Sequence, residues 1–181
     1  MKTNRAVLYV TILVSLIGVL SSLAWSQGES ATSATPVSDA AVERTRKQVS
    51  MLDDLYKAAF VLITTHYVSD KSTLPAGSAA VTLFDAMRQK GWHEVRLLDA
   101  TGKPLFERNS PKDDFERFAI EQLLSGEEYV DRVVEIDGKH YLRAATPMPV
   151  LLGKCAACHP HYSEVTDGEP VGSMSYTVPI E

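Results

Sequence analysis

One five-residue stretch, Cys155-Ala156-Ala157-Cys158-His159, constrains this chain more than any other feature. It has the C-x-x-C-H spacing that attaches a c-type haem covalently, with each thiol forming a thioether to one vinyl group of the porphyrin. The short spacer lets a single turn of backbone present both thiols, and the histidine that follows can place an imidazole nitrogen on the iron. We therefore expect one covalent haem c on Cys155 and Cys158, with His159 as the proximal iron ligand.

The cysteine count supports this expectation and leaves two other uses of the thiols open. The chain has 2 cysteines, both inside the motif, so no third thiol remains for a disulfide or an iron ligand. A thioredoxin-like redox pair would follow an early strand in a βαβ pattern, which does not surround this pair. A zinc site that adds His159 and His161 to the two thiols would need a second ligand pair across a longer loop, and the sequence has none.

The N-terminal residues predict export. Lys2 and Arg5 precede an apolar run over residues 6–25, and residues 24–26 (Ala-Trp-Ser) offer the small side chains that a signal peptidase recognises. We expect residues 1–26 to be a signal peptide, with an uncleaved anchor as the alternative, because about twenty apolar residues can span a bilayer. In either case the haem domain is expected to be periplasmic, on the side of the membrane where bacteria attach c-type haem.

Length and charge bound the domain and its partners. Residues 27–38 are rich in Ser, Thr and Ala and predict a flexible linker. That leaves residues 39–181 as one haem-binding domain with a core of its own. The chain has a net charge of -5, and the basic segment 1–26 makes the remainder more acidic still. We therefore expect no nucleic-acid partner, and contact with a membrane only if residues 1–26 stay attached.

Apolar residues at helical spacing predict three helices. The first is expected to run from an N-cap at Asp39 to about Tyr67, with a face that could pair with the same helix of a second copy. A second helix is expected over residues 77–89, with Gly91 just past its end. A third is expected after an N-cap at Ser110, with Pro111 in the first helical position and an end near Leu124.

Alternating hydrophobicity and turn residues predict five strands in a mostly antiparallel sheet. The dipeptide Asp137-Gly138 is a strong signal for the two-residue turn of a β-hairpin. With the helices on one side, this order of elements indicates an α+β domain whose haem motif lies in the loop before the last strand. The expected strands are residues 93–99, 104–106, 129–136, 140–145 and 172–179.

Several segments of the chain resemble one bacterial family. Residues 143–149 (Arg-Ala-Ala-Thr-Pro-Met-Pro), 154–160 around the haem motif and 172–176 (Gly-Ser-Met-Ser-Tyr) are similar to it, and residues 109–116 resemble its segment entering the middle helix. The family comprises c-type haem domains with a PAS-like fold, first catalogued as a domain of unknown function. Such domains occur as extracytoplasmic sensors and as stand-alone proteins. The resemblance covers about residues 48–181 and implies a PAS-like sheet, with the haem held between the sheet and the N-terminal helices.

The resemblance also bears on the sixth, distal iron ligand. Some members take a thiolate from the helix before the first strand, but residues 77–89 contain no cysteine. The side chains on apolar helix faces that could serve instead are His66 and Met87. Water or an open site is a further alternative. Lesser candidates are His93, His161, Met148 and Met174.

Arginines and tyrosines could line the haem. One or two arginines on or beside predicted strands could pair with the propionates, although any single surface arginine is more often merely solvated. Tyr162 and Tyr176 flank the motif and are expected near the porphyrin ring. The candidate arginines are Arg96, Arg108, Arg132 and Arg143.

Two functions from different classes follow. The first is electron transfer by a single-haem, cytochrome-like protein whose iron exchanges one electron with an unknown redox partner protein. The second is a sensor, in which the haem binds a small ligand or reports redox state and the first helix passes the signal to a partner. No output segment is recognisable after the last strand, which favours electron transfer. An enzyme is least expected, because no distal His/Arg pair of the kind that a peroxidase needs stands out.

Overall fold

The computed structural model describes residues 36–67 and 75–181. The expected signal peptide and most of the expected linker fall in residues 1–35, outside the described part of the chain. Residues 36–181 form one unit. Within the two described ranges, no helix is long and apolar enough to cross a membrane.

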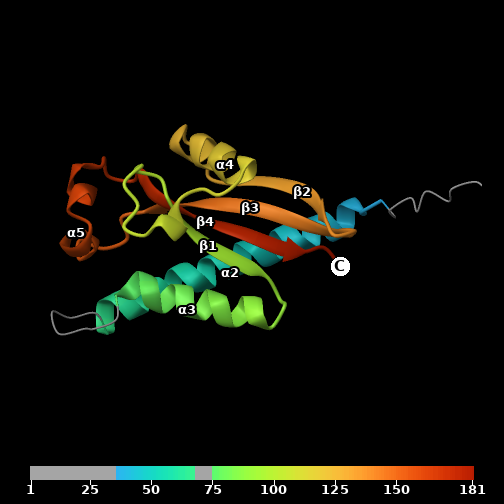
Figure 1. The fold of residues 1–181 in the computed structure, drawn as a ribbon, viewed down its shortest axis with the longest axis horizontal. Coiled ribbons are helices and arrows are strands. Elements are labelled where there is room, and N and C mark those ends of the chain that lie inside the picture. Colours follow the sequence, from blue (N-terminus) through green and yellow to red (C-terminus); the bar gives the residue numbers. More distant parts are fainter. Residues whose placement is uncertain (1–35, 68–74) are drawn as a thin grey trace, which may run out of the picture. The chain divides into compact units, whose positions relative to one another are not determined.

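Four antiparallel strands form one open sheet in the order β1-β4-β3-β2, which confirms the α+β class (Figure 1). The strands are β1 (Glu94–Asp99), β2 (Val130–Ile136), β3 (Lys139–Pro149) and β4 (Pro170–Pro179). The last strand in sequence thus lies between the first and third strands, and the two edges of the sheet are β1 and β2.

The expectation of a fifth strand at residues 104–106 is wrong. The carboxylate of Asp99 accepts hydrogen bonds from the Thr101 hydroxyl at 2.8 Å and from the backbone N–H of Lys103 at 3.1 Å. These bonds build a local turn that leads the chain away from the edge of β1. Residues 104–106 then run into a short 3-10 helix, η1 (Glu107–Asn109), and β1 keeps β4 as its strand partner.

Strands β2 and β3 form the predicted hairpin. Asp137 and Gly138 have φ angles of 50° and 73°, the two positive values that a type I′ turn requires. Strand β3 continues beyond Ala145 to Pro149, where a loop was expected. Because β2 starts at Val130, opposite Ala145, β3 has only β4 beside it past that point, and proline is tolerated in such an edge segment.

The long helix α2 (Asp39–His66) and helix α3 (Ala76–Gln89) match the first two expected helices closely. The N-cap of α2 is Ser38 rather than Asp39, since the Ser38 side chain accepts a hydrogen bond from the Ala41 N–H at 3.2 Å. Asp39 becomes the first helical residue, where its negative charge favours the positive end of the helix dipole. Gly91 follows α3 with a φ of 76°, as predicted.

Helix α4 (Asp114–Leu124) begins later than predicted. Its N-cap is Asp113, whose carboxylate accepts a hydrogen bond from the Glu116 N–H at 3.0 Å, and not Ser110. The guanidinium of Arg96 donates to the Ser110 carbonyl at 3.2 Å and holds that residue in an extended conformation. The helix therefore starts at the acidic cap Asp113, which is followed three residues later by Glu116, and not at the Ser110-Pro111 pair upstream.

Helices cover both faces of the sheet, so the expectation of helices on one side is wrong (Figure 1). Neighbouring residues of a strand point to opposite faces. On one face, Ala144 belongs to a core that α2 and α3 complete with Tyr56 and Phe84. On the other, Ala145 packs with residues of α4 in a smaller core. That smaller core comprises Phe115, Ala119, Leu123, Val130 and Ala145.

The haem motif lies in the connection between β3 and β4, before the last strand as predicted. This connection holds two short helices, α5 (Cys155–Cys158) and η2 (Pro160–Glu164). It returns to the sheet at Pro170, opposite Pro149 of β3, and Gly172 then pairs with Asp99 at the end of β1. A Cβ added at Gly172 would come 2.6 Å from the Leu98 carbonyl oxygen, so only glycine lets β4 approach β1 this closely.

Candidate functional site

The two cysteines are the first and last residues of helix α5, a single helical turn. Residues three apart in a helix lie on the same face, so the turn presents both side chains together. Both thiols are free, with Cys155 half-buried and Cys158 exposed. The pair is therefore accessible for modification from outside the protein.

His159 follows the turn with a half-buried imidazole. Its N–H donates back to the Cys155 carbonyl at 3.0 Å, which ties the histidine to the cysteine turn. Burial, reinforced by the nearby His161 and opposed by Asp99, lowers the pKa of His159. The imidazole is consequently neutral at neutral pH, the form in which a ring nitrogen can donate its lone pair to a metal.

Two aromatic residues of η2 surround His159. The ring of Tyr162 stacks on the imidazole with a centroid distance of 4.5 Å, and His161 meets both rings edge-on. The Nε2 atom of His161 is buried and has no hydrogen-bond partner in the described part of the chain. Tyr162, which was expected near the porphyrin ring, thus lies in direct contact with the expected iron ligand.

The motif lies beside the C-terminal end of α2. The Nζ atom of Lys154, the residue before Cys155, is 3.5 Å from the carbonyl oxygen of Thr65. His66 is the next residue and the last of α2, and its side chain is exposed. Of the two main candidates for the distal ligand, His66 therefore lies on the segment next to the motif.

Met87 lies elsewhere. It is near the C-terminal end of α3, from which the chain turns into the start of β1 at Glu94. The motif is near the other end of β1, because the charge of Asp99 is close enough to push the pKa of both His159 and Tyr162 upward. The six residues of β1 span roughly 17 Å at the usual rise of a strand, so the structure does not bring Met87 to the motif.

The lesser candidates for the distal ligand also differ in where they lie relative to the motif. His93 precedes β1 and its Nε2 is 2.7 Å from the Tyr56 hydroxyl, and burial lowers the His93 pKa. Met174 is fully buried in the core, where its sulfur lies 3.6 Å from the Tyr176 hydroxyl. Met148 is half-buried near the end of β3 and opposite Gly172, on the side of the sheet from which the motif loop leaves.

Tyr176 does not lie beside the motif but in the core beneath α2. Its hydroxyl donates to Asp53 Oδ1 at 2.9 Å, and the hydroxyl of Thr146 donates to the same oxygen at 2.5 Å. The other oxygen of Asp53 accepts from Lys57 at 2.8 Å. This network anchors α2 to β3 and β4. Sequence reasoning missed it, because a charged residue on a helix is usually solvated.

Two of the four candidate arginines are engaged with acids of the domain itself. Arg96 and Arg143 both form ion pairs with Glu116, whose side chain is 0% exposed, and Arg143 also binds Asp113 at 2.7 Å. The Glu116 carboxylate accepts further bonds from Ser175 and from the Lys112 N–H. This cluster fixes α4 to the sheet, and these two guanidinium groups have their carboxylate partners already.

The other two arginines have aromatic neighbours. Arg132 lies over the ring of Phe118 at 5.4 Å, next to α4, and Arg108 lies over the ring of Phe106 at 4.9 Å. Arg108 belongs to η1, in the loop that follows β1. Arg108 therefore has no carboxylate partner among the described residues. It also lies in the segment that continues from Asp99, near the motif.

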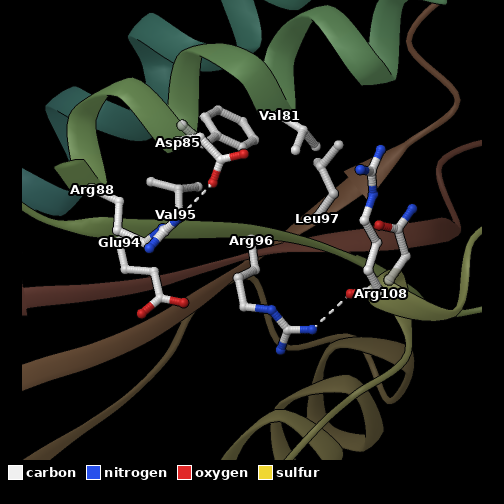
Figure 2. Close-up of a pocket in the computed structure, with 10 residues that line it drawn as sticks. Val81, Asp85, Arg88, Glu94, Val95, Arg96, Leu97 and Arg108 are labelled. Carbon is white, nitrogen blue, oxygen red and sulfur yellow. Dashed lines mark hydrogen bonds and ion pairs between the residues drawn. The ribbon is translucent and has the colours of Figure 1, made fainter.

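A shallow groove runs between α3 and the outer edge of β1 (Figure 2). Its volume is about 190 Å³, and Val81 and Leu97 face each other across its floor. Arg88 pairs with Asp85 at one end, while Arg108 lies at the other. Arg96 points away from the groove, toward the Arg108 carbonyl at 2.8 Å. Among the described residues, the Arg108 guanidinium in this groove therefore has no carboxylate partner.

Over residues 36–67 and 75–181, no three His, Cys, Asp or Glu side chains are grouped so as to hold a metal ion. The residues of the motif nevertheless fit a covalent haem in their chemistry. They supply two accessible thiols on one turn and a neutral imidazole directly after it.

A family model described as Tll0287-like matches residues 28–178, which include helices α2 to α5, strands β1 to β3, all but the last residue of β4, and the C-x-x-C-H motif. No curated protein matches the chain.

Proposed function

This chain belongs to the Tll0287-like family, and on that premise we propose that it is an extracytoplasmic protein with one covalent haem c that transfers single electrons. The observation that carries the proposal is helix α5, which brings Cys155 and Cys158 onto one accessible turn with the neutral His159 directly after it. We also propose that the domain is PAS-like and that the haem lies between the sheet and the N-terminal helices.

The residues of the motif have separate roles in this proposal. Cys155 and Cys158 would hold the porphyrin through thioethers, and His159 would supply a ring nitrogen to the iron. When bound, the haem supplies an iron centre that changes its oxidation state by one electron. Cys158 is exposed, so the attachment site lies at the protein surface, where a redox partner can approach. The domain is acidic, which suits transient docking to a basic partner.

His66 is the proposed distal ligand. The contact between Lys154 and Thr65 places the motif loop against the last turn of α2, and His66 has no side-chain hydrogen bond or ion pair among the described residues. A second nitrogen ligand would give a six-coordinate iron with a lower reduction potential than a methionine ligand would.

If the reduced haem is low-spin, we expect His66→Ala to convert it to a high-spin form, because the distal position loses its side-chain donor. The visible absorption spectrum of the reduced protein measures this change. Met87→Ala is the matched control and should leave the spectrum unchanged, since Met87 lies at the other end of β1. A high-spin Met87→Ala protein, or no change in either variant, would refute His66 as the ligand.

A sensor remains the second candidate, and one observation favours it. Helix α2 ends beside the motif and is anchored to the sheet by Asp53, so a change at the haem could be passed along a helix of 28 residues. The first candidate predicts a stable and reversible one-electron couple in a redox titration, with weak carbon monoxide binding by the reduced form. Rapid, tight carbon monoxide binding with a change in oligomeric state would reverse this ranking.

The proposal of a homodimer through the first helix also stays a prediction. Helix α2 leaves apolar residues exposed at spacings of four, three and four, which is the pattern of a helix-pairing face. These residues are Met51, Leu55, Ala58 and Leu62.

A further inference from the structure

The ring of Tyr162 lies flat against the imidazole of His159. The two ring planes differ by only 6° at a centroid distance of 4.5 Å, an offset stack of the kind that attracts aromatic rings. We infer that Tyr162 is a positioning residue, which sets the orientation of the His159 imidazole as an iron ligand. The inference rests on the proposed function and adds a residue to it.

The local backbone puts Tyr162 in this place. His159 is the N-cap of η2, and the Tyr162 N–H donates to the His159 carbonyl at 2.9 Å. Side chains three residues apart in a 3-10 helix lie one above the other, which is the relation of these two rings. Pro160 stands between them with its φ angle restrained by its own ring, so the turn has little freedom. The stack is thus a consequence of the residue order His-Pro-x-Tyr.

His161 closes the cluster from the side. Its ring makes an angle of 76° with His159 and 78° with Tyr162, at centroid distances of 5.9 and 4.8 Å. Because its buried Nε2 has no hydrogen-bond partner among the described residues, packing rather than hydrogen bonding holds this ring in place. The edge-on contact limits the sideways movement of Tyr162 and so supports the stack.

The stack matters because, among the described residues, no hydrogen bond restrains the plane of the His159 imidazole. In many metal sites the second ring nitrogen of a ligating histidine donates to a carbonyl or carboxylate, and that bond sets the plane of the ring. In the described part of the chain, the His159 side chain makes no hydrogen bond. The contact with Tyr162 is made by the face of its ring.

The test compares Tyr162→Leu, which removes the ring, with Tyr162→Phe, which keeps it, in the full-length protein after haem loading. Tyr141→Leu is the matched control, because Tyr141 lies far from the motif, toward the other end of β3. Two signals depend on the plane of the axial imidazole: the electron paramagnetic resonance g-values of the oxidised haem and the spread of the haem methyl proton shifts. Haem absorbance per protein gives the loading of each variant.

We expect Tyr162→Leu to shift both signals, with Tyr162→Phe and Tyr141→Leu retaining the wild-type values. Tyr162→Met serves as a second ring-free variant if the leucine protein fails to load haem. Unchanged signals in a loaded ring-free variant would overturn the positioning role and leave the proposed function standing. A change in Tyr162→Phe as large as in Tyr162→Leu would also overturn it, because the hydroxyl rather than the stack would then be responsible. A colourless wild-type protein refutes the proposed function itself, and the inference with it, before any variant is compared.

Discussion

The Cys155→Ala/Cys158→Ala double variant is expected to carry no haem that survives denaturation, whereas the wild type keeps its haem colour on a denaturing gel. Both thiols lie on one turn of α5, and they are the only cysteines in the chain, so no other thioether can form. The loss is therefore expected to be complete rather than partial. Expression with an active haem-maturation system and peroxidase staining of the gel measure it.

The two single variants and a neighbour provide the controls. Each single cysteine variant retains one thiol and should keep a reduced amount of covalent haem. Ala157→Ser changes an exposed residue between the cysteines without touching a thiol and should stain like the wild type. A colourless wild type would contradict the proposal, and metal analysis of that protein would then show whether zinc occupies the thiols instead.

Patterns that are local in sequence predicted the structure well. The hydrophobic spacing of α2, the Asp137-Gly138 turn and the place of the motif before the last strand all depend on residues close together in the chain. The match to a domain family likewise confirms the suspected family membership. Haem attachment, the distal ligand and the cellular location stay predictions, because they concern chemistry or segments outside the described contacts.

Sequence patterns did not predict the features that depend on contacts between residues far apart in the chain. The helix cap moved from Ser110 to Asp113 because Arg96, on another element, binds the Ser110 carbonyl. Strand pairing puts Tyr176 in the core, where its hydroxyl binds Asp53, a contact that no local sequence pattern predicted. The burial of Glu116 was not predicted, since an acidic residue on an amphipathic helix is usually solvated.

Glu116→Gln is expected to destabilise the protein by about 3–5 kcal/mol, because removing one partner of a buried ionic cluster leaves the other charges uncompensated. The Glu116 side chain is 0% exposed, and the partner side chains of Arg96 and Arg143 are 18% and 12% exposed. The amide of glutamine can keep some of the hydrogen bonds but cannot balance two guanidinium charges. Urea unfolding followed by circular dichroism gives the change in the free energy of unfolding.

Asp85→Asn is the matched control for the charge change. Asp85 pairs with Arg88 at 3.0 Å, but both side chains are about half exposed, at 51% and 55%. Solvent screens such a pair, so its loss should cost about 1 kcal/mol or less. If Glu116→Gln costs no more than Asp85→Asn, then water reaches the cluster and α4 is held by its apolar contacts alone. A much larger loss of unfolding free energy in Glu116→Gln than in Asp85→Asn instead identifies Glu116 as the residue that holds α4 on β1, β3 and β4. Helix α4 packs there on the face of the sheet opposite α2 and α3.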